Sequence, residues 1–171
     1  MAFRIPVVGF IAWSGTGKTT LISSLLPILR ARGIRVGVIK HTHHNVEFDT
    51  PGKDSHRLRT AGASQMLVTS ARRWALYSDK EDFEDEQDIF TELERLKTDE
   101  LDLVIVESFK RAPIPKIELH RESLGKPLIH PSDSHVVAVA SDEPINNDGS
   151  LTLLDLNDPE QIVAYIVNQL M

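Results

Sequence analysis

"AWSGTGKTT", residues 12–20, has the spacing of a loop that binds phosphate groups at the start of a helix. Gly15 and Gly17 allow the backbone to turn tightly and to point its N–H groups toward phosphate oxygens. Ala12 stands where the common pattern has a first glycine. An apolar run over 5–12 precedes the loop and predicts a buried strand, and apolar residues at helical spacing follow it. Because a phosphate loop requires both of these flanks, we predict that the chain binds the phosphates of a nucleotide.

The loop motif assigns a role to several side chains. Lys18 is expected to reach the β- and γ-phosphates, and the Thr19 hydroxyl to be a ligand for Mg²⁺. Glu107 ends a buried strand pattern, the position of the acidic residue that completes such a metal site. We predict Lys18 and Glu107 as catalytic residues, and Asp49 and Asp54 as additional metal ligands. The residues predicted to hold the nucleotide through this loop are Ser14, Gly15, Thr16, Gly17, Lys18, Thr19 and Thr20.

Trp13 occupies a second informative position in the loop. One branch of phosphate-loop proteins carries a lysine there that reaches across a dimer to the partner's phosphate. Because this chain has tryptophan instead, we do not expect that mode of activation.

The order of patterns along the chain predicts an α/β fold with a doubly wound, mainly parallel sheet, the P-loop NTPase fold. With 171 residues, one nucleotide-binding domain over 1–171 is expected. The segments that predict strands are 5–12, 34–40, 65–70, 72–78, 101–107, 114–122, 134–142 and 151–156. Helical patterns follow the phosphate loop, cover 55–61 and 159–170, and include Ile89, Leu93 and Leu96. Asp54 and Asp158 are expected to cap two of these helices, with Gln161 completing a capping box.

The composition excludes several classes of protein. The net charge of −6 gives no general basic surface for nucleic acid, so no nucleic-acid partner is expected. The chain has no cysteine, which excludes disulfides and thiolate metal sites. Since no segment reaches the roughly 18 apolar residues of a membrane span, we expect a cytoplasmic protein without membrane attachment.

A histidine-rich segment follows the predicted strand 34–40. Three interpretations are open: a transition-metal site, contact with phosphates or a second substrate, or an ordinary polar loop. We favour a role at the mouth of the active site, because nearby cations form a local basic patch in an acidic chain. The histidines are His41, His43, His44 and His56, and the cations are Lys40, Lys53, Arg57 and Arg59.

The choice of base depends on one carboxylate. An aspartate can accept hydrogen bonds from guanine N1–H and N2–H₂ together, a pattern that adenine does not offer. Residues that read the base in this fold class follow late strands, where Asp142 and Asp155 lie. We favour Asp142 and guanine; the alternative is that Asp142 only caps the turn before Pro144.

Several segments, in order along the chain, resemble one family. They are "AWSGTGKTTL", "IKHTHH", "PGKDSHRLRTAGA", "RRWAL", "LDLVIVESFK" and "VVAVASDEP", and they are similar to the molybdopterin-guanine dinucleotide biosynthesis protein B (MobB) family. The resemblance implies a cytoplasmic, dimeric protein that binds GTP and Mg²⁺ and hydrolyses GTP weakly. It also implies a partner, the MobA-type guanylyltransferase, which joins GMP to molybdopterin. The family usually has glycine after the acidic residue that corresponds to Glu107, where this chain has Ser108.

The leading hypothesis is therefore a GTP-binding adapter of molybdenum cofactor biosynthesis that is at most a weak GTPase. One alternative is a metal-delivery protein that uses GTP and carries its cargo on the histidine segment 41–56. Another is a small-molecule kinase, although the chain lacks the arginine-rich lid typical of such enzymes. An exposed hairpin around Trp74 and Leu76 is a candidate interface, but a buried position in the core is the stronger expectation for such side chains.

Overall fold

The computed structural model describes residues 5–42, 47, 49–78, 88–146, 149 and 151–171. Contacts group the chain into two compact units. One unit comprises Met1–His41 and Gln87–Met171, and the other comprises Thr42–Glu86. A single nucleotide-binding domain over the whole chain stays a prediction.

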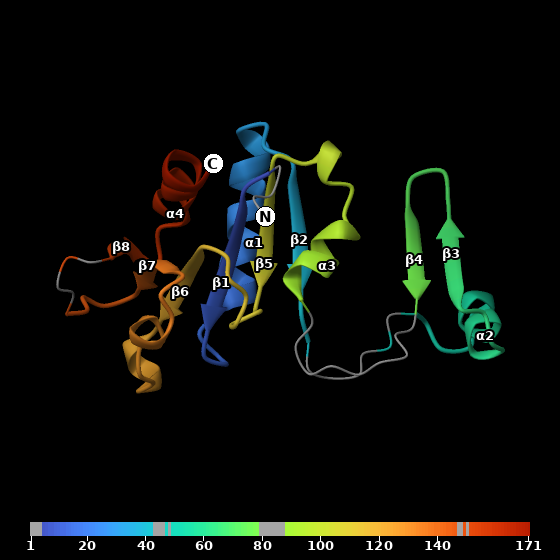
Figure 1. Cartoon of the computed structure of the whole chain (residues 1–171), viewed down its shortest axis with the longest axis horizontal. Helices are drawn as coiled ribbons and strands as arrows, with labels where there is room; N and C mark the ends of the chain where they lie inside the picture. Colours follow the sequence, from blue (N-terminus) through green and yellow to red (C-terminus); the bar gives the residue numbers. More distant parts are fainter. Residues whose placement is uncertain (1–4, 43–46, 48, 79–87, 147–148, 150) are drawn as a thin grey trace. The chain divides into compact units, whose positions relative to one another are not determined.

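The first unit is built on a parallel six-stranded sheet (Figure 1). Its strand order is β2-β5-β1-β6-β7-β8. The chain passes from β1 to β2 on one side, whereas β6, β7 and β8 lie on the other, so the switch point of the topology falls at β1, where open α/β sheets bind ligands. This sheet confirms the predicted doubly wound, mainly parallel α/β fold. The strands are β1 (Val7–Ala12), β2 (Val36–Lys40), β5 (Leu103–Glu107), β6 (Lys116–His120), β7 (Val136–Ser141) and β8 (Thr152–Asp155).

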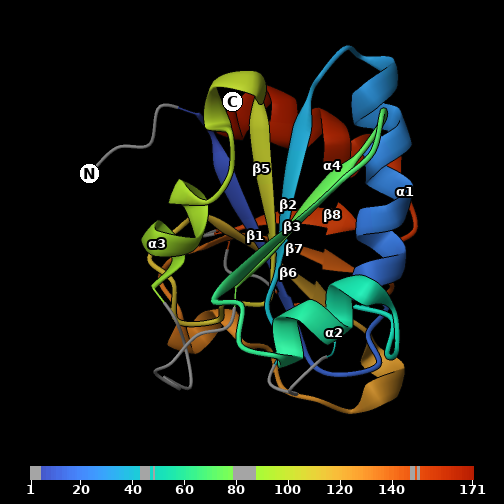
Figure 2. The same ribbon diagram turned by 90° about the vertical axis from the view of Figure 1, so that its right-hand side faces the viewer.

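Helices cover both faces of this sheet, which explains why every residue of β1 and β5 is buried. Helix α1 (Lys18–Ala31) and helix α4 (Pro159–Tyr165) pack on one face, and α3 (Ile89–Glu94) packs on the other, as Figure 2 shows for α1 and α3. A π-helical turn, Ile166–Leu170, continues α4. Short 3₁₀ turns span Thr98–Glu100, Glu122–Leu124 and His130–Ser132. The described part of the chain contains no helix that is long and apolar enough to cross a membrane.

The start of α4 shows one correct and one wrong expectation. The Asp158 carboxylate accepts a hydrogen bond from the Gln161 backbone N–H at 3.0 Å, as an N-cap does. The Gln161 side chain does not return to the N-cap. Its Oε1 accepts from the Asp155 backbone N–H at 2.6 Å, while the Asp158 N–H donates to the Asp155 carbonyl. The predicted capping box is wrong because Gln161 ties the helix to the end of β8 instead.

The second unit contains helix α2 (Asp54–Thr60) and an antiparallel pair, β3 (Gln65–Thr69) and β4 (Trp74–Ser78). The two strands are those predicted. Asp54 is the first residue of α2 and not its cap, since Lys53 takes the N-cap position without a side-chain hydrogen bond. The expectation that the hairpin side chains are buried is wrong: Trp74 is 58% exposed and Leu76 52%.

Candidate nucleotide site at the end of β1

The loop after β1 has the backbone that an anion site needs. Gly15 and Gly17 have φ angles of 84° and 95°, in the left-handed region that favours glycine. A Cβ at either position would meet no atom closer than 3.9 Å. The positive φ angle, and not a lack of room for a side chain, therefore explains why glycine occupies both positions. Gly17 is the N-cap of α1 and supplies no side-chain acceptor. The first N–H groups of α1 are therefore open to an anion.

Hydrogen bonds hold this loop from both sides. Thr16 is 2% exposed, and its hydroxyl donates to the Trp13 carbonyl at 2.8 Å. The Thr16 carbonyl accepts from Arg121 Nε at 2.9 Å. Arg121 follows β6, the strand next to β1 in the sheet. These hydrogen bonds within the protein hold the loop in a fixed shape, independently of a bound ligand.

The predicted metal ligands Thr19 and Glu107 meet in the structure. The Thr19 hydroxyl donates to Glu107 Oε1 at 2.7 Å, and Glu107 is 7% exposed at the end of β5. A hydroxyl and a buried carboxylate are hard oxygen donors, which Mg²⁺ prefers. Glu107 also pairs with Lys40 at 3.4 Å, because the two residues are register partners on β5 and β2. The donor set fits Mg²⁺, with Thr19 and Glu107 as the residues that would hold it.

The charge around Lys18 is unusual. Burial lowers the pKa of Lys18, the attraction of Glu107 opposes this, and the neighbouring cations Lys110 and Lys40 lower it further. Three ammonium groups therefore share the field of one carboxylate. Such a surplus of positive charge in a chain of net charge −6 favours an anionic ligand.

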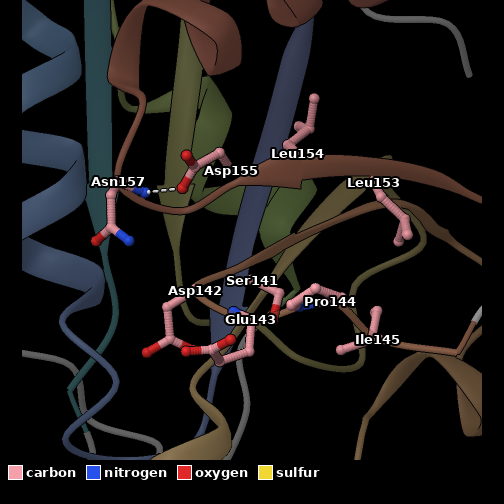
Figure 3. Close-up of a pocket in the computed structure, with 9 residues that line it drawn as sticks. All are labelled: Ser141, Asp142, Glu143, Pro144, Ile145, Leu153, Leu154, Asp155 and Asn157. Carbon is pink, nitrogen blue, oxygen red and sulfur yellow. Dashed lines mark hydrogen bonds between the residues drawn. The ribbon is translucent and has the colours of Figure 1, made fainter.

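The two aspartates considered for base recognition line one pocket at the ends of β7 and β8 (Figure 3). Asp142 Oδ2 accepts from Arg121 Nη1 at 3.1 Å, and Oδ1 accepts from the Glu122 backbone N–H at 3.2 Å. The carboxylate of Asp142 thus contacts residues after β6 and does not cap the turn that follows it, so that alternative is wrong. The pocket has a volume of about 360 Å³ and is lined by Ser141, Asp142, Glu143, Pro144, Ile145, Leu153, Leu154, Asp155 and Asn157.

Arg121 is the residue that connects the two parts of the site. Its guanidinium contacts both the Thr16 carbonyl of the phosphate loop and the Asp142 carboxylate of the pocket. Arg121 is not among the site residues predicted from the sequence. The sequence did contain a pattern that indicates Arg121, because a basic residue directly after a strand of a parallel sheet lies at the edge that binds ligands.

The other predicted residues of the first unit are also at this edge. The His41 backbone N–H donates to the Glu107 carbonyl at 3.3 Å, and the His41 ring packs at 5.1 Å from the Phe109 ring. Ser108 and Phe109 have φ angles of 81° and 53°. The left-handed backbone after Glu107 explains why glycine suits the position of Ser108.

The remaining predicted residues belong to the second unit. Asp49 accepts from the Ser55 hydroxyl at 3.1 Å, and Asp54 lies at the start of α2. His56 Nε2 lies 3.8 Å from the Glu47 carboxylate, which also pairs with Arg59. His43 and His44 lie outside the described residues. The roles of Asp49 and Asp54 as Mg²⁺ ligands, and of the histidines, stay predictions.

Among the residues that the structure describes, no group of three or more histidines and carboxylates could hold a metal ion. The Thr19–Glu107 pair differs from such a cluster, because Mg²⁺ at a phosphate loop takes its remaining ligands from phosphate and water.

Comparison with known proteins gives a consistent result over nearly the whole chain. A family model described as "Molybdopterin guanine dinucleotide synthesis protein B" matches residues 7–142. The molybdopterin-guanine dinucleotide biosynthesis adapter protein of Escherichia coli K12 is 51% identical over 164 residues, covering 95% of this chain and 92% of that protein. The adapter protein of the same name from Haemophilus influenzae is 45% identical over 167 residues, covering 98% and 90%. A crystal structure of Bacillus subtilis MobB superposes with a TM-score of 0.74 at 27% identity, covering 98% of this chain and 99% of that one.

Proposed function

The chain belongs to the molybdopterin guanine dinucleotide synthesis protein B (MobB) family and acts in molybdopterin guanine dinucleotide biosynthesis, and from this premise we propose that it is a GTP-binding adapter. The observation that carries the proposal is the 2.7 Å hydrogen bond between Thr19 and Glu107 directly beside Lys18. It brings the two expected Mg²⁺ ligands together at the start of α1, where the N–H groups of the loop are open to phosphate.

In this proposal each part of the site has one task. The loop N–H groups and Lys18 bind the phosphates, and Thr19 and Glu107 hold Mg²⁺, which would neutralise phosphate charge. Asp142, positioned by Arg121, accepts hydrogen bonds from guanine, with Asp155 in the same pocket. A carboxylate oxygen has two lone pairs, so the contacts of Asp142 with Arg121 and Glu122 leave acceptor capacity for the base.

We expect GTP hydrolysis to be slow. Lys18 would bind the negative charge of the phosphates. Glu107 is the carboxylate beside Lys18, and in this proposal it holds Mg²⁺. Because a carboxylate that holds Mg²⁺ does not also orient the attacking water, hydrolysis lacks that contribution. The chain then works mainly through binding, as an adapter for a MobA-type guanylyltransferase that attaches GMP to molybdopterin in the cytoplasm.

We further propose that the chain forms a homodimer through the β3–β4 hairpin. Leu67 and Leu76 are cross-strand partners and are 55% and 52% exposed. A two-stranded hairpin alone is marginally stable in water, and a second copy of the same hairpin would cover this apolar surface. Sedimentation of the Leu67→Glu/Leu76→Glu variant tests this. It should be monomeric, and a dimer of unchanged affinity would contradict the hairpin interface.

Calorimetric titration tests the nucleotide assignment. GTP with Mg²⁺ should bind far more tightly than ATP, and Lys18→Ala should abolish binding with the fold intact by circular dichroism. The Asp142→Asn variant should have a lower affinity for GTP and a higher affinity for xanthosine triphosphate, whose C2 carbonyl can accept a hydrogen bond from the new amide. Equal affinity for ATP and GTP would refute the guanine assignment, and full GTP affinity in Lys18→Ala would refute the site.

A further inference from the structure

Trp13 is an unusually placed tryptophan. It lies in the phosphate loop and is 37% exposed, although most residues of its size are packed inside a protein. Its indole N–H donates to the Pro127 carbonyl at 2.8 Å. That hydrogen bond fixes the ring, so a flat aromatic surface is held in one orientation beside the nucleotide site.

Two lysines from different segments lie over this ring. Lys110 Nζ is 5.0 Å from the ring centroid, and Lys126 Nζ is 6.0 Å from it. Lys110 comes from the turn after β5, and Lys126 follows the 3₁₀ turn Glu122–Leu124. Within the described residues neither ammonium is paired with a carboxylate. Their positive charge is therefore available to a ligand.

This combination has a specific chemical preference. An exposed indole stacks on a planar π-system, and contacts of this kind contribute about 1–3 kcal/mol when a base stacks on an aromatic side chain. The two ammonium groups, which lie 5.0 and 6.0 Å from the ring centroid, can pair with an anion attached to that planar π-system. A tryptophan that served only to cover Pro127 would not require two cations close to its ring, since bringing like charges together is unfavourable.

We propose that Trp13, Lys110 and Lys126 form a second ligand site for a planar aromatic heterocycle that bears a phosphate or carboxylate group. The site is distinct from the pocket of Asp142 and Asp155, and it adjoins the phosphate loop through Trp13 itself. The inference deepens the proposed function by giving the chemical class of a second ligand beside the nucleotide. A pterin with an anionic side chain and the base and phosphate of another nucleotide share this chemistry.

Intrinsic fluorescence provides a direct assay, because the chain has two tryptophans, Trp13 and Trp74. In the Trp74→Phe variant, Trp13 is the remaining indole emitter. This protein is saturated with a non-hydrolysable GTP analogue and Mg²⁺, then titrated with pterin-6-carboxylate, AMP or ribose 5-phosphate, with calorimetry in parallel. Saturable quenching by an aromatic anion is expected, and ribose 5-phosphate should have little effect. Preference for the pterin identifies a pterin site, whereas preference for AMP identifies a site for a second nucleotide.

Variants separate stacking from charge. Trp13→Ala should weaken the aromatic anion about tenfold or more by calorimetry, while Trp13→Phe should retain part of the affinity. Lys110→Gln and Lys126→Gln should each weaken it about two- to fivefold at low ionic strength and reduce its salt dependence. The matched control is Lys97→Gln, which should leave the affinity unchanged. Lys97 is an exposed lysine at the N-cap of the 3₁₀ turn Thr98–Glu100.

The possible failures are distinguishable. No binding of either aromatic anion to a protein that binds the GTP analogue normally would overturn this inference alone. Equal binding of ribose 5-phosphate, or unchanged affinity in Trp13→Ala, would overturn it as well. Failure of the GTP analogue to bind would instead count against the proposed function, and the aromatic anions could still be titrated by themselves.

Discussion

Ser108→Gly should make the protein more stable, although glycine substitutions usually destabilise. Ser108 follows Glu107 with a φ angle of 81°, in the region that residues with a Cβ rarely adopt. Its backbone N–H donates to the Phe10 carbonyl at 3.1 Å, which fixes the turn to β1. The strain is therefore imposed by the sheet and is not relieved by a small movement of the loop.

The size of the effect follows from two opposing terms. A left-handed conformation costs an L-residue about 1–2 kcal/mol, which glycine does not incur. Glycine also gives the unfolded chain more freedom, which costs about 0.4–1 kcal/mol of stability. The difference predicts a gain of about 0.5–1 kcal/mol in the free energy of unfolding, or a rise in Tm of about 1–4 °C for a chain of this length.

Urea unfolding of three variants measures this difference. Ser108→Gly should raise the midpoint, and Ser108→Ala should leave it near the parent value because alanine keeps the strain. Ser23→Gly is the matched control: Ser23 is exposed within α1, and the same chemical change there should cost about 0.3–0.5 kcal/mol. If Ser108→Gly is no more stable than Ser108→Ala, the backbone argument is refuted.

Three further predictions concern charged side chains. Arg121→Ala should weaken GTP binding about tenfold, or about 1.4 kcal/mol, because the phosphate loop and Asp142 lose the side chain that holds them in position. Unchanged affinity by calorimetry would remove Arg121 from the site. Asp133→Ala should lower the free energy of unfolding by about 3 kcal/mol in urea, because Lys116 is 1% exposed and loses its 2.7 Å partner, and Lys116→Met in the same chain should restore much of the loss. The Arg35 guanidinium hydrogen-bonds to Asp102 and lowers the pKa of that carboxyl to about 2, so the stability this pair contributes is present above pH 4 and is lost as the pH falls toward 2. NMR titration should find the pKa of Asp102 raised from about 2 toward its ordinary value of 3.8 in Arg35→Ala, although the backbone N–H of residue 35 still donates to Asp102 Oδ2, and a pKa that stays near 2 would contradict the assignment.

Features that depend on neighbours in the chain were predictable. The phosphate loop combines glycines, a lysine and a threonine within nine residues, and its flanking strand and helix have their own periodic patterns. Glu107 could be assigned to the metal site because a strand of a parallel sheet presents its last residue at the edge where β1 also ends. The exposure of Trp74 could not be predicted, since an alternating strand pattern does not say which face meets other residues.

The sequence by itself determined the parallel α/β fold, the phosphate loop and the pairing of Thr19 with Glu107, because each rests on local pattern and on a rule of sheet topology. Only the tertiary structure decided that Arg121 joins the phosphate loop to Asp142, and that lysines from two distant segments lie over Trp13. These contacts join residues that are far apart in the chain, and their partners depend on the strand order and on the path of each turn. "AWSGTGKTT" therefore specifies an anion site at the start of α1, and the surrounding fold specifies what lies next to that anion.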